Sequence, residues 1–143
     1  MHIPSISIEV LQAARRSDSS LRSLDAATLD RSELRYRKFL ALVAKYPNES
    51  LAPAKDIDDV WHLHMLHPRA YVDDCMRIFG SVLDHDGGFG NSSPEEFAEL
   101  ESVFARTSSL WAAEFDEIYA EQPAEGVVKC IRACRVACKK KVA

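Results

Sequence analysis

The chain has 143 residues, 47% of them hydrophobic, which is enough for one domain with a buried core. Its 18 Lys and Arg against 22 Asp and Glu give a formal net charge of -4, which argues against broad nucleic-acid binding through phosphate contacts. Four cysteines are too few for a disulfide scaffold, so thiols or metal ligands are expected.

The charge is divided unevenly along the chain. Residues 129–143 contain six basic residues and no acid, which leaves 12 basic and 22 acidic residues, a net of -10, for residues 1–128. No apolar run approaches the ~18–20 residues of a membrane span, and the first residues lack the features of a secretory signal. We expect a cytoplasmic protein with an acidic domain over residues 1–123 and a basic, cysteine-containing tail over 124–143.

Helical spacing of apolar residues predicts a first helix over residues 5–16. Asp30 and Glu33 are spaced as a capping box, so a second helix is expected to begin there and to end before Pro47. The residues expected on its buried face are Leu34, Phe39, Leu40, Val43 and Tyr46.

A third, short helix is predicted over residues 56–66, and Pro68 marks the bend into a fourth over residues 69–79. Gly80 suits the end of that helix, because glycine adopts a positive φ without strain.

After a glycine-containing loop over residues 81–92, Ser93, Pro94 and Glu96 form the clearest helix start in the chain. An apolar stripe then continues toward Tyr119; its members are Phe97, Leu100, Phe104, Trp111, Phe115 and Ile118. Because alternating Val- and Ile-rich runs are few, the predicted fold is all-α, a compact bundle of about four to five helices with a short basic tail.

The densest chemistry lies between Asp56 and Pro68, which hold three of the five histidines and three carboxylates within thirteen residues. The ordered motif residues are Asp56, Asp58, Trp61, His62, His64, Leu66, Pro68, Tyr71, Asp74, Cys75, Phe79, Gly80, His85, Phe89 and Gly90. This pattern, over about residues 53–90 with weaker support to about 121, resembles the signature of the glycine-rich domain-containing protein-like family. The resemblance implies a fold more than a mechanism, since the family lacks a settled activity.

Helix geometry limits which of these side chains can meet. Residues four apart share a face and residues two apart lie about 200° apart, so Asp58 and His62 can converge while His62 and His64 cannot. His85 from the glycine-containing loop would complete a set of three ligands for Zn, Fe or Cu. His64 is a less favoured ligand, because it cannot converge with His62 on a regular helix. Cys75 is also less favoured, because it has the spacing of an inert core thiol.

Two other interpretations of the motif remain open. Asp58 can instead fix the tautomer of His62 by accepting its N–H, and His64 and His67 can be structural side chains that orient two helices. A small metal-dependent enzyme is a third possibility, although no P-loop, nucleophile elbow or His-Glu-x-x-His motif supports catalysis.

The tail carries Cys130, Cys134 and Cys138 at intervals of four residues, and neighbouring positive charge favours the thiolate. The tail can dock on the acidic half of its own domain, bind a soft metal or form disulfides. It can also be the segment that a modifying enzyme alters, as in precursors of ribosomally made, modified peptides.

The sequence therefore favours a binding or scaffold domain with a protein partner and one transition-metal ion at Asp58, His62 and His85. The precursor is the alternative, with the tail-modifying enzyme as the partner and the tail over about residues 127–143 as the substrate.

Overall fold

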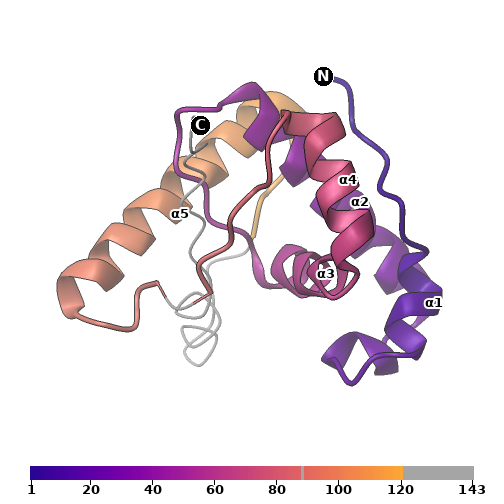
Figure 1. Cartoon of the computed structure of the whole chain (residues 1–143). Coiled ribbons are helices and arrows are strands. Elements are labelled where there is room, and N and C mark those ends of the chain that lie inside the picture. The colour runs from indigo at the N-terminus through magenta and orange to yellow at the C-terminus, as the bar shows by residue number, and fades with distance from the viewer. Residues whose placement is uncertain (88, 121–143) are drawn as a thin grey trace.

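The computed structural model describes residues 1–87 and 89–120, and this part of the chain folds as a helical bundle without β-strands (Figure 1). It contains five α-helices and one short 3-10 helix, which confirms the predicted all-α class. Their bounds are α1 Val10–Arg15, η1 Ser20–Ser23, α2 Ala26–Lys45, α3 Lys55–Met65, α4 Pro68–Phe79 and α5 Pro94–Phe115. None of the helices in the described part has the length and apolar character that a membrane span requires.

The second helix begins earlier than predicted. Asp25 is the N-cap of α2, and its carboxylate accepts a hydrogen bond from the Thr28 amide at 2.7 Å. The expected capping box at Asp30 and Glu33 is wrong, since both residues lie inside the helix. The earlier start adds a turn that places Leu29 in the core, where its side chain is fully buried.

The caps of α4 and α5 confirm the predictions made for them. Pro68 occupies the first turn of α4, and Gly80 ends that helix with a φ of 72°. The Ser93 hydroxyl accepts a hydrogen bond from the Glu96 amide at 3.1 Å, while the Glu96 carboxylate accepts one from the Ser92 amide at 2.9 Å. Together these bonds satisfy amides at the start of α5 that have no partner within the helix.

The predicted apolar faces of α2 and α5 each include one wrong member. Leu34 is exposed on α2, because the core contacts the face that carries Tyr36, Phe39 and Leu40. The last helix ends at Phe115, where Asp116 takes a φ of 52°, so Ile118 leaves the helical register and lies in solvent.

The first helix is shorter than predicted, because a polar side chain on α4 bonds the segment that precedes it. The Ser7 amide and hydroxyl donate to the two carboxylate oxygens of Asp74 at 2.6 and 2.5 Å. Arg77 donates to the same carboxylate at 2.8 Å and to the Ser5 carbonyl at 2.7 Å. With its backbone bonded in this way, the segment enters α1 only at Val10.

Asp74 also joins a buried polar chain that connects three helices. His64 of α3 lies 3.0 Å from the Asp74 carboxylate through Nε2 and 2.9 Å from the Tyr36 hydroxyl of α2 through Nδ1. All three side chains are buried, so each group depends on the others to replace water. Burial alone would raise the pKa of Asp74, but the hydrogen bonds from Ser7 and Arg77 outweigh it and hold the pKa below its ordinary value.

Figure 1 shows α1 to α4 grouped on one side and α5 running along the other. The segment between α2 and α3 joins the two parts, since the Ala52 amide donates to the Thr107 hydroxyl at 3.0 Å. The Tyr119 hydroxyl accepts from the Ala54 amide at 2.8 Å and donates to the Ala52 carbonyl at 2.7 Å. A small apolar cluster of Ala52, Phe89 and Leu100 closes the same interface.

Two described glycines with positive φ, Gly80 and Gly90, give a matched test of the loop between α4 and α5. Gly80→Ala meets no atom within 4 Å and should cost about 1 kcal/mol through backbone strain alone. Gly90→Ala should cost more, because its φ is 93° and the added Cβ would lie 2.7 Å from Leu100 Cδ2. Urea unfolding of both variants measures the two losses in the free energy of unfolding. Equal losses would contradict the prediction and would show that Leu100 moves aside without cost.

Asp74→Asn should lower the free energy of unfolding by about 2–4 kcal/mol, since it removes the charge that Ser7, His64 and Arg77 bond. Because folding lowers the pKa of Asp74, its stabilisation is present above the ordinary value of 3.8 and is lost as pH falls through the lowered folded-state value.

The variant should therefore lose stability at neutral pH and show a flatter acid dependence than the parent. The exposed neighbour Asp73 provides the control, and Asp73→Asn should change neither quantity appreciably. Chemical denaturation measured at several pH values tests both expectations; an unchanged acid dependence in Asp74→Asn would contradict the assignment.

Candidate metal centre

Three side chains from two segments converge beside α3. Asp58 and His62 lie one helical turn apart on α3, and His85 comes from the loop that follows α4. The two Nε2 atoms of His62 and His85 are 2.7 Å apart. Asp58 Oδ1 lies 3.1 Å from His85 Nε2 and 3.5 Å from His62 Nε2. The structure therefore brings together the three residues that the sequence predicted as ligands.

The spacing of these donor atoms suits a transition-metal ion. An ion about 2.0–2.2 Å from each donor in tetrahedral geometry holds its ligand atoms about 3.3 Å apart, and the observed separations bracket that value. Among the residues that the structure describes, this is the one group of three His, Cys, Asp or Glu side chains with such convergence.

Two atoms of this cluster are buried without a hydrogen-bond partner among the described residues, Asp58 Oδ1 and His85 Nδ1. A buried carboxylate oxygen without a donor costs free energy, unless a cation or a proton compensates it. A metal bound between Asp58 Oδ1 and the two Nε2 atoms would supply that compensation for Asp58.

His85 is positioned by the aromatic core. Its ring stacks on Trp61 with the centroids 4.4 Å apart and an interplanar angle of 27°. Trp61 Nε1 donates to the Tyr71 hydroxyl at 3.0 Å, and that hydroxyl donates to the carbonyl of Leu83, two residues before His85. The loop is thus fixed to α3 and α4 at the point where it presents the imidazole.

The two acids of the Asp-x-Asp motif have separate roles. Asp56 forms an ion pair with Arg35 of α2 and lies outside the cluster. The Arg35 guanidinium also lies over the Trp111 ring, 5.1 Å from its centroid, and donates to the Tyr119 carbonyl. Asp56 therefore helps attach the end of the described chain, whereas Asp58 faces the two histidines.

The other residues considered as ligands lie elsewhere. His64 belongs to the buried chain with Tyr36 and Asp74; burial lowers its pKa, although the nearby Asp74 opposes that effect. The His67 Nδ1–H donates to the Leu63 carbonyl at 2.9 Å. Cys75 is buried, which raises the pKa of its thiol and keeps it protonated. Cys130, Cys134 and Cys138 lie outside the described residues.

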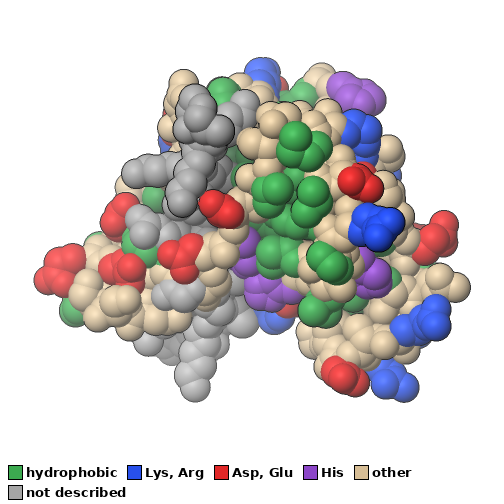
Figure 2. Space-filling view, in the orientation of Figure 1, with side chains coloured by type: hydrophobic (Ala, Val, Ile, Leu, Met, Phe, Trp, Pro, Cys, Tyr) green, Lys and Arg blue, Asp and Glu red, His purple; other side chains and the backbone are tan. Residues whose placement is uncertain are grey.

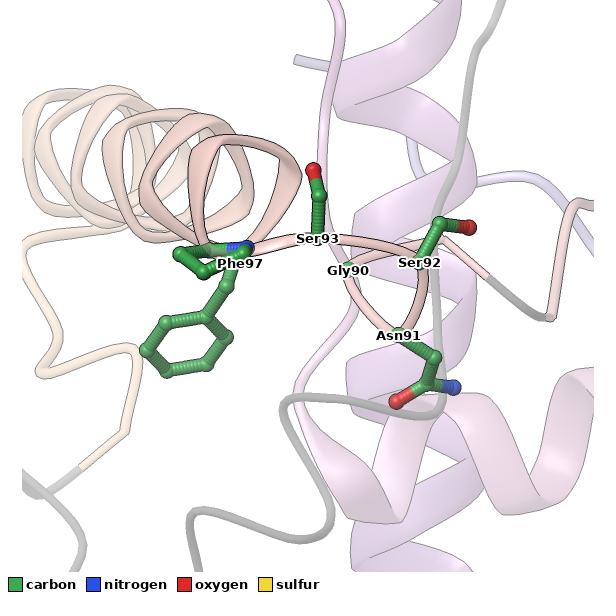
Figure 3. A pocket seen from close by; sticks show the side chains of 6 residues that line it. Gly90, Asn91, Ser92, Ser93 and Phe97 are labelled. Atoms are coloured by element: carbon green, nitrogen blue, oxygen red, sulfur yellow. The ribbon is translucent and has the colours of Figure 1, made fainter.

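Two surface cavities are lined by other residues. One, of about 410 Å³, opens at the start of α5 and is lined by Gly90, Asn91, Ser92, Ser93, Pro94 and Phe97 (Figure 3). The other, of about 530 Å³, is lined by Met1, His2, Pro4, Ala41, Ala44, Lys45, Arg77 and Ile78. The first contains no acid or base, and Arg77 in the second already bonds Asp74 and Ser5.

The support for His85 was missed in the sequence. Trp61 and Tyr71 are both buried in the core, and their contact with the loop was not predicted from the sequence. An aromatic side chain at helical spacing indicates burial and does not indicate which distant residue will stack on it. The one feature of the sequence that could have indicated this contact is that Trp61 and Tyr71 belong to the same motif as His85.

Comparison with known proteins supports the resemblance found in the sequence. Residues 19–74 match the model of the glycine-rich domain-containing protein-like family. Glycine-rich domain-containing proteins 1 and 2 of Arabidopsis thaliana are 34% and 32% identical to this chain over 95 residues. These matches cover 64% of this chain but only 11% and 12% of the relatives.

No solved structure gives a significant match to the chain. The family model begins earlier than the motif quoted from the sequence and includes Asp58 and His62 but not His85. Over residues 19–74, the chain is therefore similar to the glycine-rich domain-containing protein-like family.

Proposed function

We propose that this domain binds one transition-metal ion through Asp58 Oδ1 and the Nε2 atoms of His62 and His85. The observation that carries the proposal is the buried Asp58 Oδ1, which lacks a hydrogen-bond donor among the described residues. It lies 3.1 and 3.5 Å from two imidazole nitrogens that themselves approach to 2.7 Å. Three potential ligand atoms so close together are well accommodated by a cation.

A proton shared between the two imidazoles is the simplest alternative occupant. One Nε2–H can donate to the other Nε2, but the second nitrogen is then an acceptor and Asp58 Oδ1 keeps no well-directed donor. A metal ion bonds all three donors at once, which favours it over the shared proton.

The donor set indicates which class of metal is suited. Two imidazoles and one carboxylate favour Zn, Fe or Cu over Mg or Ca, which prefer sites made of oxygen atoms.

The domain itself is proposed to serve as a binding or scaffold module with a protein partner. The matched region is a small part of the Arabidopsis relatives, which is typical of a module within a longer chain. Figure 2 shows hydrophobic side chains gathered over α4, and Val72 and Met76 of that helix are 41% and 51% exposed. Exposed apolar side chains of this kind favour contact with another protein.

Protein purified without a histidine tag should contain close to one transition-metal ion per chain. Asp58→Asn should lose most of that metal, because the amide carries no charge and is a weak ligand. The neighbouring Asp59, which pairs with Lys55 outside the cluster, provides the control. Elemental analysis should therefore find metal in the parent and in Asp59→Asn, and little metal in Asp58→Asn.

Two results would contradict the proposal. One is a parent protein that contains no metal and takes up none when Zn, Fe or Cu is added. The other is equal metal content in Asp58→Asn and Asp59→Asn, which would place the ion elsewhere in the chain.

A second candidate function rests on the abrupt change of composition after Gly126. We propose as an alternative that the chain is a peptide precursor, in which residues 1–123 are recognised by a modifying enzyme and the tail is modified. The supporting observation is that three of the four cysteines and six of the 18 basic residues lie in residues 127–143.

Intact-mass spectrometry of the protein from its native host tests this alternative. The precursor hypothesis predicts a mass change or cleavage that maps to Cys130, Cys134 or Cys138. A full-length, unmodified mass under producing conditions would remove the hypothesis and leave the metal proposal untouched.

A further inference from the structure

We infer that the metal ion keeps one coordination position open to solvent and that this position binds a small anion. The inference rests on the proposed metal site and concerns what completes it. Among the described residues, three donors converge there. Structural zinc sites are closed by four protein ligands, whereas three protein ligands leave a position for water or another exchangeable ligand.

The burial of the three ligands is strongly asymmetric. The side chains of Asp58 and His85 are 8% and 3% exposed, whereas that of His62 is 49% exposed. Asp58 and His85 therefore form the floor of the site, and His62 forms its edge. Figure 2 shows histidine side chains at the molecular surface between α4 and α5.

The size of the donor triangle places the ion outside its plane. With edges of 2.7, 3.1 and 3.5 Å, the three atoms are too close together for an ion about 2.0–2.2 Å from each to lie between them. The ion must therefore lie to one side of the triangle. A fourth ligand would approach from that side, and the exposed His62 gives solvent access to the site.

Charge selects the class of the fourth ligand. A divalent ion with one carboxylate and two neutral imidazoles retains a net charge of about +1. Within the described residues, Asp58 pairs with His62 and His85, and no Lys or Arg of that part of the chain forms an ion pair with it. An anion such as azide, carboxylate or hydroxide neutralises this charge, which a neutral ligand does not.

The ligands are also held without the ion, which argues against a purely structural site. Trp61 stacks on His85, and Tyr71 bonds the Leu83 carbonyl, so the loop is anchored by the protein itself. Asp58 and His62 lie on a regular helix whose opposite face is in the core. The ion is therefore not needed to anchor its own ligands, unlike the metal of a structural zinc site.

Cobalt(II) added to the metal-free full-length chain tests the inference, because its visible absorption reports coordination. Azide is titrated into the cobalt form of the parent and of a variant that combines Cys130→Ser, Cys134→Ser and Cys138→Ser. We expect saturable shifts of the cobalt bands in both proteins, with a new azide-to-cobalt charge-transfer band. The cobalt bands themselves should be lost in Asp58→Asn and kept in Asp59→Asn.

The outcomes separate this inference from the metal proposal. Cobalt bands that azide does not change would show a closed site and overturn the inference, while the metal proposal stands. A thiolate-to-cobalt band that disappears in the triple serine variant would also overturn it, since a tail cysteine would be the fourth ligand. Absence of cobalt binding would overturn the metal proposal, and this inference with it.

Discussion

Trp61 lies fully buried where α2, α3, α4 and the loop after α4 meet, and each of these segments contacts it. Its ring packs against Phe39 and Tyr36 of α2, with centroids 5.6 and 6.4 Å apart. Its indole nitrogen donates to Tyr71 of α4, and its ring stacks on His85. Burial of one large side chain therefore sets both the packing of the helices and the position of the distant histidine. The candidate centre depends on this packing.

The neighbouring histidines of α3 show how one helix serves two purposes. His62 and His64 are two residues apart, so their side chains leave the helix in different directions. His64 enters the interior and joins Tyr36 and Asp74, where burial keeps its pKa low. His62 remains half-exposed beside Asp58 and His85. A dense motif thus divides into a structural network and a separate group of potential ligands.

The acidic character of the domain is partly balanced by its own cations. Lys38 pairs with Glu117, Lys45 with Glu114 and Arg106 with Glu49, and each pair joins a residue of α5 or the segment after it to the α2 side of the molecule. Such exposed pairs contribute little individually to stability. Because all three pairs link α5 or the segment after it to the same side of the molecule, together they favour one orientation of that helix. The other contacts that hold α5 are a small apolar cluster and the hydrogen bonds of Thr107 and Tyr119.

The sequence by itself determined the helical class, the caps at Ser93 and Gly80 and the convergence of Asp58 with His62, because these depend on local spacing along one helix. It misplaced the starts of α1 and α2, since the bonds of Ser7 to Asp74 and the burial of Leu29 involve residues far apart in the chain. His85 was named from its place in a motif, but only the tertiary structure decided that its Nε2 faces Asp58. The physical reason is that a loop residue takes its position from what it packs against, and here that is the buried face of Trp61.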